Sequence, residues 1–258
     1  MTDLQQRAAA FDDLDVARCY AHRPPYVPAL YEFLLGLVPR KDCLVDLGCG
    51  PGKIAAALAG NFARVVAIDP AIAMIETAKA TYSQPNIRWL HASAEDAALP
   101  DNIDLVTAGT SIHWMKHEVL FPRLAGRTPL VAVITGDAPL NPPWLDGESD
   151  FLTRWLARLH GRTFDRPAFI ADGRIYEPWL DIAGRHDFTF TFRQSIADYI
   201  ACQHSRASWP RSKMGAELVL EFDRELEAVL TPFAQGELLS FDLTSELVWG
   251  PPRKTVRG

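Results

Sequence analysis

The stretch VDLGCGPGK, residues 45–53, decides the fold of this chain. Three glycines fall within five positions directly after an apolar run. Glycine adopts backbone conformations that other residues avoid, and without a Cβ it lets the main chain approach a small anion closely. The stretch therefore predicts a strand that ends in a glycine loop and a helix start, placed to hold an anionic group.

Two kinds of phosphate-binding loop fit this stretch poorly. A triphosphate loop needs G-x-x-x-x-G-K followed by Ser or Thr, whose hydroxyl ligates magnesium. Here Ile54 follows Lys53, and Leu47 stands five positions before Gly52. A dinucleotide loop needs G-x-G-x-x-G, and Lys53 stands where its third glycine belongs. The triphosphate interpretation fails, while an NAD-dependent oxidoreductase stays open as an alternative.

Nearly continuous apolar runs alternate with helical patterns through the first half of the chain. Such runs are typical of strands that helices cover on both faces, as in parallel sheets. We therefore expect an α/β fold with a doubly wound, mostly parallel sheet. The expected strands are residues 44–47, 65–69, 87–92, 103–109 and 130–135, with helices over 54–60 and 71–82.

The pattern changes after Gly136. Residues 186–192 (HDFTFTF) alternate cleanly between polar and apolar side chains, which predicts an antiparallel strand with one buried face. A closing strand is expected over 238–249, and helices are expected over 151–160, 195–206 and 216–230. We accordingly divide the single domain into an N-terminal helical lid segment (1–40), a cofactor-binding core (41–136), and helical insertions with closing antiparallel strands (137–258).

The composition favours a soluble protein with a small partner. Of the 258 residues, 48% are hydrophobic, which is enough for a sizeable core. No apolar run approaches the roughly 18 residues of a membrane span, and the N-terminus lacks a signal-peptide pattern, so we expect a cytoplasmic protein and no membrane partner. A formal net charge of −6 disfavours nucleic acid. We expect a monomer or homodimer, with reduced core thiols at Cys19, Cys43, Cys49 and Cys202.

Three elements at successive strand ends carry a family resemblance. The segment Asp46-Leu47-Gly48-Cys49-Gly50-Pro51-Gly52 resembles the first motif of the class I S-adenosylmethionine-dependent methyltransferases. Asp69 ends the next expected strand, and HASAED (91–96) follows the one after it. The resemblance implies the seven-stranded, Rossmann-like fold of that family, with S-adenosyl-L-methionine as cofactor and S-adenosyl-L-homocysteine as its product.

The resemblance also implies cofactor contacts. The loop N–H groups are expected to be unpaired donors for the cofactor's carboxylate, and Asp46 is expected to meet its ammonium directly or through water. A carboxylate at a strand tip can accept both hydroxyls of a ribose, which is the role expected of Asp69. The alternative is that Asp69 only caps the following helix. Ile72 and Met74 are candidates to cover the adenine, and the resemblance places HASAED (91–96), with Ala94 and Glu95, at the adenine amino group. The expected cofactor-binding residues are Asp46, Gly48, Gly50, Asp69, Pro70, Met74, Ala94, Glu95 and Thr110.

The segment TSIHWMKHE (110–118) follows the fourth strand, where a methyl acceptor would lie. Its His-Trp pair resembles the methyltransferase type 11 subgroup that includes trans-aconitate methyltransferases. We expect His113 to act as a base, because its unperturbed pKa lies nearest neutrality, and Trp114 to wall the pocket. The alternative for His113 is a helix-capping role. His113 and His117 do not form a zinc helix, because H-E-x-x-H requires Glu where Trp114 stands, and no metal is expected.

Two further segments are expected at the acceptor side. YAHRPPY (20–26) resembles the segment that folds over the cofactor in the same subgroup, which makes Tyr20, Arg23 and Tyr26 candidate lid residues. SRASWP (205–210) is expected to contribute Trp209. NPPW (141–144) resembles an amino-methyltransferase motif but follows the fifth strand instead of the fourth, so we interpret it as a turn.

The sequence thus predicts an enzyme that transfers a methyl group from S-adenosylmethionine to oxygen or nitrogen of a small molecule, with a natural product or carboxylic acid as acceptor. A carbon methyltransferase of quinone-like metabolism has the same core and remains an alternative. A catalytically silent cofactor-binding protein also remains open, because every motif binds cofactor and none requires turnover.

Overall fold

The computed structural model describes residues 9–136, 139–161, 163 and 174–256. The expected lid segment and insertions include residues outside these ranges. By its internal contacts the chain divides into two compact units. We call Pro25–Asp137, Phe169–Phe188 and Ser245–Gly258 the sheet unit, and Met1–Pro24, Ala138–Ala168 and Thr189–Thr244 the helical unit. These units interleave in the sequence and so cut the chain differently from the three segments that we expected.

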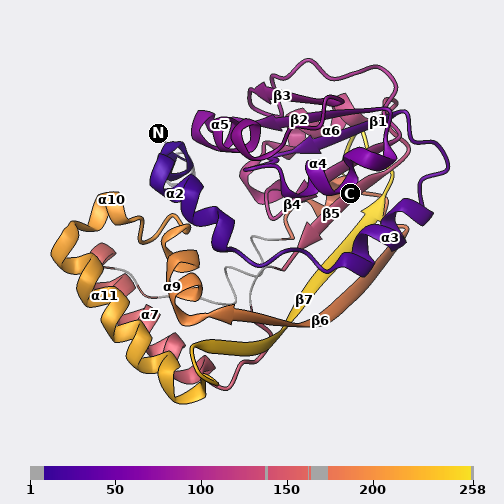
Figure 1. Ribbon diagram of the computed structural model, residues 1–258. Helices are drawn as coiled ribbons and strands as arrows, with labels where there is room; N and C mark the ends of the chain where they lie inside the picture. The colour runs from indigo at the N-terminus through magenta and orange to yellow at the C-terminus, as the bar shows by residue number, and fades with distance from the viewer. Residues whose placement is uncertain (1–8, 137–138, 162, 164–173, 257–258) are drawn as a thin grey trace. The chain divides into compact units, whose positions relative to one another are not determined.

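The strands form one seven-stranded sheet in the order β3-β2-β1-β4-β5-β7-β6 (Figure 1). The first five strands are parallel, and β7 runs antiparallel to β5. The expectation of a doubly wound, mostly parallel sheet is confirmed. The strands are β1 (Cys43–Leu47), β2 (Arg64–Asp69), β3 (Ile87–His91), β4 (Leu105–Gly109), β5 (Val131–Thr135), β6 (Gly184–Ser195) and β7 (Leu238–Gly250).

Alternate residues of each central strand of the sheet unit enter different cores. Val45 and Leu47 of β1 belong to one cluster, with Leu120 and Phe121 of α6 (His117–Leu124). Leu44 belongs to the other cluster, with residues of three helices. Since both faces are covered, these strands had to be apolar at nearly every position. The three helices are α3 (Pro28–Gly36), α4 (Lys53–Leu58) and α5 (Ile72–Thr81), and the short 3-10 segments of the unit are η3 (Ala59–Asn61), η4 (Ile112–Trp114) and η5 (Glu177–Trp179).

The helical unit packs around its own aromatic core. Within it, α7 and α11 lie side by side (Figure 1), and Trp144, Phe151 and Phe222 are fully buried between its elements. The hydroxyl of Tyr199 donates to both carboxyl oxygens of the buried Glu148, at 2.8 and 2.9 Å, and burial raises the pKa of Glu148. The elements are η1 (Ala9–Asp12), α2 (Leu14–Cys19), η2 (Tyr20–His22), α7 (Leu145–His160), α9 (Ile196–His204), α10 (Arg211–Met214), α11 (Ala216–Leu230) and η6 (Thr231–Phe233).

The strand β6 follows the alternation predicted over 186–192. In β6 the phenylalanines are half-buried while the threonines between them are exposed. The hydroxyl of Thr191 donates to the Asp242 carboxylate at 2.7 Å, and the hydroxyls of Thr189 and Thr244 lie 3.0 Å apart. The residue number rises along β6 from 189 to 191 while that of its partner in β7 falls from 244 to 242, so the two strands are antiparallel there, as predicted. The turn predicted over 141–144 directly precedes α7, and the four cysteines are free and buried, also as predicted.

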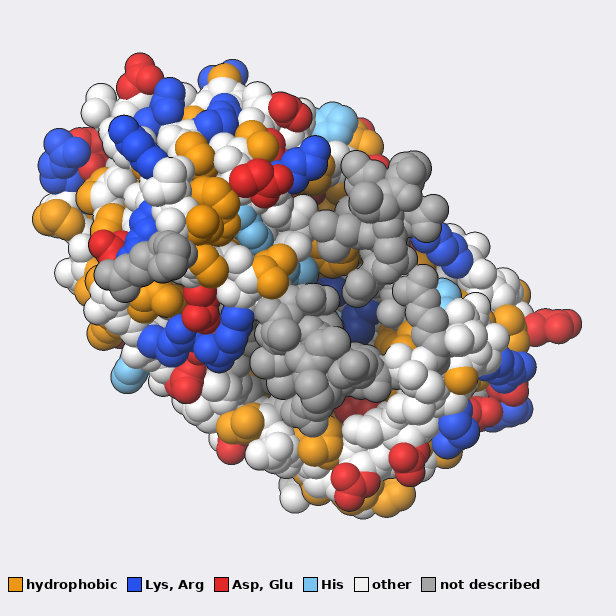
Figure 2. Space-filling model, turned by 180° about the vertical axis from the view of Figure 1, so that it is seen from behind, with side chains coloured by type: hydrophobic (Ala, Val, Ile, Leu, Met, Phe, Trp, Pro, Cys, Tyr) orange, Lys and Arg blue, Asp and Glu red, His pale blue; other side chains and the backbone are white. Residues whose placement is uncertain are grey.

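Charged side chains of both signs are mixed on the molecular surface. On the face in Figure 2, Lys and Arg side chains lie among Asp and Glu side chains. On the described part of that face, neither sign of charge gathers in one area. No helix in the described ranges has both the length and the apolar character that crossing a membrane requires.

Candidate functional site

The glycine loop after β1 requires glycine for two different reasons. Gly48, Gly50 and Gly52 all have positive φ, at 61°, 52° and 91°, where other residues are strained. A Cβ on Gly48 would lie 2.5 Å from Cβ of Ser111, and one on Gly52 would lie 2.5 Å from the Trp89 ring. A Cβ on Gly50 would meet nothing within 4 Å. Gly48 and Gly52 are thus needed for packing inside the protein, while Gly50 faces open space.

Asp69 links this loop to the next helix. One oxygen of its carboxylate accepts a hydrogen bond from the N–H of Gly50 at 2.8 Å, and the other accepts one from the N–H of Ala71 at 2.8 Å. The structure thus brings the ends of β1 and β2 together through one side chain. The carboxylate at the end of β2 thus bonds both the loop after β1 and Ala71, the residue before α5.

The expected set of unpaired loop N–H groups is wrong for three positions. Cys49 N–H donates to the carbonyl of Ile68 at 3.0 Å, and Gly50 N–H donates to Asp69. Gly52 N–H donates to the carbonyl of Cys49 at 3.0 Å. A tight loop satisfies its own donors, because a buried unpaired N–H is costly. The glycines shape the loop more than they supply donors.

Asp46 is buried beneath the loop. It is 1% exposed. The Thr107 hydroxyl donates to one carboxyl oxygen at 2.8 Å, and the N–H of Ala55 donates to the other at 3.2 Å. Burial raises the pKa of Asp46 to about 7, against the lowering effect of these two hydrogen bonds, and the nearby Asp69 charge adds to the rise. Asp46 therefore titrates near neutral pH, and its contact with an ammonium stays a prediction.

The start of α5 offers Ile72 rather than Met74 as an apolar surface. Met74 is 2% exposed, while Ile72 is 40% exposed. Residues 72 and 74 point to different sides of a helix, because two positions turn it by about 200°. The structure therefore disfavours Met74 as a residue that covers adenine. Pro70 is exposed at the end of β2, and its carbonyl lies 2.9 Å from His91 Nε2.

The segment after β3 is held from outside by a residue that the sequence did not single out. Ala94 is buried, and the carboxylate of Glu95 accepts a hydrogen bond from the N–H of Lys116. The guanidinium of Arg123 in α6 donates to the carbonyls of Ala94, Glu95 and Ala97. No motif marks Arg123, because its acceptors are main-chain carbonyls.

The His-Trp pair lies on η4, beyond the end of β4. The rings of His113 and Trp114 are both half-buried, with centroids 4.9 Å apart. His117, in contrast, is buried, and its Nε2 lies 2.8 Å from the Ile112 carbonyl. His117 thus has a structural role. Among the described residues no three His, Cys, Asp or Glu side chains gather as a metal site would require.

Tyr26 lies at the same end of β4. Its hydroxyl is 3.2 Å from the hydroxyl of Thr110, which has a positive φ of 50°. A Cβ on Gly109 would lie 2.7 Å from the Tyr26 hydroxyl and 2.3 Å from Ile54. Gly109 therefore makes room for the phenol. Among Tyr20, Arg23 and Tyr26, only Tyr26 belongs to the sheet unit, where it lies at the carboxyl end of β4.

The other candidate lid residues belong to the helical unit. Arg23 donates to the hydroxyl of Ser205 at 2.7 Å and to its carbonyl at 3.0 Å, and its guanidinium lies 4.0 Å above the Tyr20 ring. Arg23 therefore joins Tyr20 to the segment 205–210 within the helical unit, and the assignment of these residues to the acceptor stays a prediction. Trp209, at 6% exposed, packs in the aromatic core, which disfavours a contact with the acceptor.

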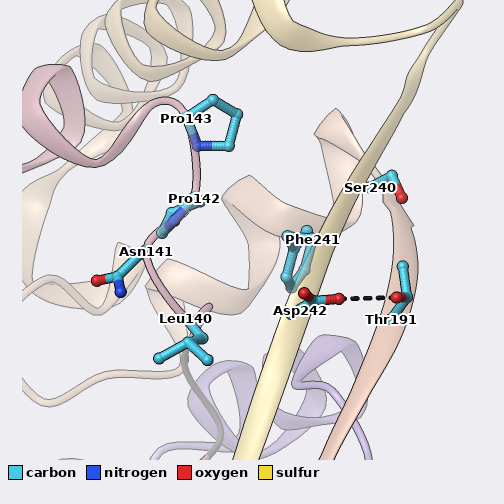
Figure 3. A pocket seen from close by; sticks show the side chains of 8 residues that line it. All are labelled: Leu140, Asn141, Pro142, Pro143, Thr191, Ser240, Phe241 and Asp242. Carbon is cyan, nitrogen blue, oxygen red and sulfur yellow. Dashed lines mark hydrogen bonds between the residues drawn. The ribbon is translucent and has the colours of Figure 1, made fainter.

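A shallow pocket lies elsewhere in the helical unit (Figure 3). The turn at Asn141 forms one wall, and the facing wall carries Asp242, which is bonded to Thr191. Its volume is about 260 Å³. None of the eight lining residues is among those predicted for cofactor or acceptor, and the pocket carries no functional assignment.

Comparisons with known proteins find a domain match within the sheet unit. A family model described as a methyltransferase domain matches residues 44–127. A trans-aconitate 2-methyltransferase of Azoarcus sp. (strain BH72) is 33% identical over 138 residues, which are 50% of this chain and 53% of that protein. An uncharacterized methyltransferase of Mycobacterium bovis is 34% identical over 136 residues, which are 49% of this chain and 66% of that protein.

A solved structure shares the fold. The structure of a putative type II methyltransferase from Anaeromyxobacter dehalogenans has a TM-score of 0.66 and 24% identity, over 91% of this chain and 99% of that one. The curated relatives match over less than two thirds of their own length. The similarity therefore establishes the fold and the domain.

Proposed function

We propose that this chain, which belongs to the class I S-adenosylmethionine-dependent methyltransferases, transfers a methyl group to oxygen or nitrogen of a small molecule. The observation that carries the proposal is the meeting of three strand ends in the sheet unit. Asp69 at the end of β2 bonds the loop after β1, and Thr110 and η4 follow β4. In open α/β sheets, ligands bind beyond these carboxyl ends.

The residues present fit S-adenosylmethionine. Gly50 presents a face without Cβ to open space, Asp69 places a carboxylate, the kind of group that accepts ribose hydroxyls, at the end of β2, and Ile72 offers an apolar surface for adenine. Asp46 lies beneath the loop as the partner for an ammonium. When bound, the cofactor would supply an electrophilic methyl group on a sulfonium.

The chain's own residues would align the acceptor and exclude water, which is most of what such a displacement needs. Trp114 would form a wall of the acceptor site, and Tyr26 would close it beside Thr110. An imidazole nitrogen of His113 would take a proton from a hydroxyl or an ammonium. A carboxylate acceptor carries no proton at pH 7, so with such an acceptor His113 would only orient it.

A carboxylic acid is the favoured acceptor class. This choice rests on the trans-aconitate 2-methyltransferases among the relatives, which include those of Azoarcus and Enterobacter. Two arginines of the insertions give it no support, because Arg158 pairs with Glu221 on the neighbouring helix at 2.8 Å, and Arg174 pairs with Glu246 at 3.1 Å.

The test combines binding with transfer. Calorimetry should detect S-adenosylhomocysteine binding in the wild type and its loss in Asp69→Ala. Methyl-labelled S-adenosylmethionine should then label an acceptor from a panel of small carboxylic acids, alcohols and amines that includes trans-aconitate. Mild base releases the label from a carboxyl ester but leaves it on nitrogen, carbon or an ether oxygen.

His113→Ala separates the two roles of the histidine. If His113 is a base, its replacement by alanine should lower kcat by about a hundredfold or more and remove the acidic limb of the pH profile. The affinity for S-adenosylhomocysteine should stay unchanged. Full activity of His113→Ala at every pH would overturn the base assignment. Tight binding of NADH without binding of S-adenosylhomocysteine would overturn the proposed function itself.

A further inference from the structure

The loop over residues 92–99 has little structure of its own. It begins at the end of β3, where the N–H of Ala92 donates to the carbonyl of Asp69 at 3.0 Å. Inside it, the hydroxyl of Ser93 pairs with the Asp96 carboxylate at 2.7 Å, and the N–H of Ala97 donates to the Ser93 carbonyl. These bonds form one turn. A loop with so few internal hydrogen bonds opens easily, so it keeps one conformation for a ligand only if a neighbouring element holds it.

That support comes from both ends of α6. At its C-terminal end, one guanidinium nitrogen of Arg123 donates to the carbonyls of Ala94, at 3.0 Å, and Glu95. The other nitrogen donates to the carbonyl of Ala97 at 2.6 Å. The rigid fork of the guanidinium suits three acceptors on one turn, whereas a lysine ammonium is a single point of charge on a flexible stem.

At the N-terminal end of α6, a side chain of the loop accepts a hydrogen bond from the main chain. The Glu95 carboxylate accepts from the N–H of Lys116, the residue directly before α6, at 2.5 Å, and Met115 alone separates Lys116 from the His113–Trp114 pair. His117 ties the helix to the Ile112 carbonyl, and Ala94 and Phe121 belong to one core cluster. The loop, η4 and α6 are therefore joined as one block.

We propose that Arg123 is a positioning residue for cofactor binding, which holds the adenine-facing loop 93–97 in register with the His113–Trp114 segment. This inference rests on the proposed function. Arg123 touches neither cofactor nor acceptor. It acts through the loop carbonyls and, together with the bond between Lys116 and Glu95, fixes the spacing between the two halves of the site.

The test uses the full chain with Arg123→Gln and Arg123→Lys. The matched control is Arg40→Gln, which removes a 70% exposed arginine whose ion pair with Asp104, at 3.1 Å, lies away from the loop. Calorimetry should find S-adenosylhomocysteine binding about tenfold weaker in Arg123→Gln, since a charged donor with three acceptors is lost. Arg123→Lys should fall between, and Arg40→Gln should match the wild type.

Hydrogen–deuterium exchange without ligand supplies a second readout that general destabilisation would not reproduce. Amides of residues 93–97 should exchange faster in Arg123→Gln while those of β1 and β2 keep their protection. If Arg123→Gln does not fold, Arg123→Lys carries both measurements. Wild-type affinity and unchanged exchange in the Arg123 variants would overturn the inference. Wild-type protein that fails to bind S-adenosylhomocysteine would instead overturn the proposed function, and the exchange measurement would then report on the loop alone.

Discussion

Asp46 shows how a single buried residue couples binding to pH. Its pKa of about 7 lies above its value of 3.8 in an exposed setting, so between these pH values the folded state binds the extra proton. The unfolding free energy contributed by Asp46 therefore falls as the pH rises from about 4 to about 7. The ionised form, present above pH 7, is the one that attracts an ammonium.

We predict that S-adenosylhomocysteine binds more tightly as the pH rises from 6 to 8, because ionised Asp46 then faces its ammonium. Calorimetry across this range tests the effect. The matched ligand is 5′-methylthioadenosine, which keeps the adenosine but lacks the ammonium and the carboxylate, and its affinity should stay flat. The same slope for both ligands would show that Asp46 does not meet the ammonium.

At the scale of the element, the loop between β1 and α4 divides its glycines between packing and ligand access. The Cβ built on Gly48 collides with Ser111, while the Cβ built on Gly50 points into open space. Both residues have a positive φ. The sequence shows that glycines are needed here, but only the structure separates their two roles.

Alanine substitutions should separate these roles experimentally. Gly48→Ala should lower the free energy of unfolding by about 2 kcal/mol or more, through backbone strain and overpacking. Gly50→Ala should cost about 1 kcal/mol through strain alone and should weaken S-adenosylhomocysteine binding. Gly36→Ala, in α3 with no neighbour within 4 Å, is the control and should be neutral or stabilising. Urea unfolding and calorimetry measure both effects, and wild-type affinity in Gly50→Ala would contradict the assignment.

At the scale of the whole molecule, the residues assigned to the cofactor fall within the sheet unit. A ligand that binds only the folded state adds about 2.7 kcal/mol of stability at a hundred times its Kd. We predict that S-adenosylhomocysteine slows amide exchange in β1, β2 and β4 and leaves α7 and α11 unchanged. Hydrogen–deuterium exchange resolved by peptide tests this. Protection of α7 and α11 without protection of β1 would place the ligand in the helical unit.

Much of the fold could be predicted because the signals are local. The apolar runs over 44–47 and 65–69 became β1 and β2, the helix predicted over 216–230 is α11 with the same ends, and alternation identified β6. The helix predicted over 151–160 begins six residues earlier, at Leu145, because its first turns are polar and lack an apolar period. Trp209 and Met74 were assigned by residue type, and burial decided against both.

The sequence by itself determined the strands, the glycine loop and the methyltransferase motif, because side-chain periodicity and the freedom of glycine at positive φ act within a few residues. Only the tertiary structure decided that Asp69 bonds the loop, that Arg123 holds the segment after β3, and that interleaved stretches form two units. The physical reason is that these bonds join main-chain groups or side chains that lie far apart in the sequence. Main-chain groups and contacts between distant residues leave no mark on the local pattern of side chains.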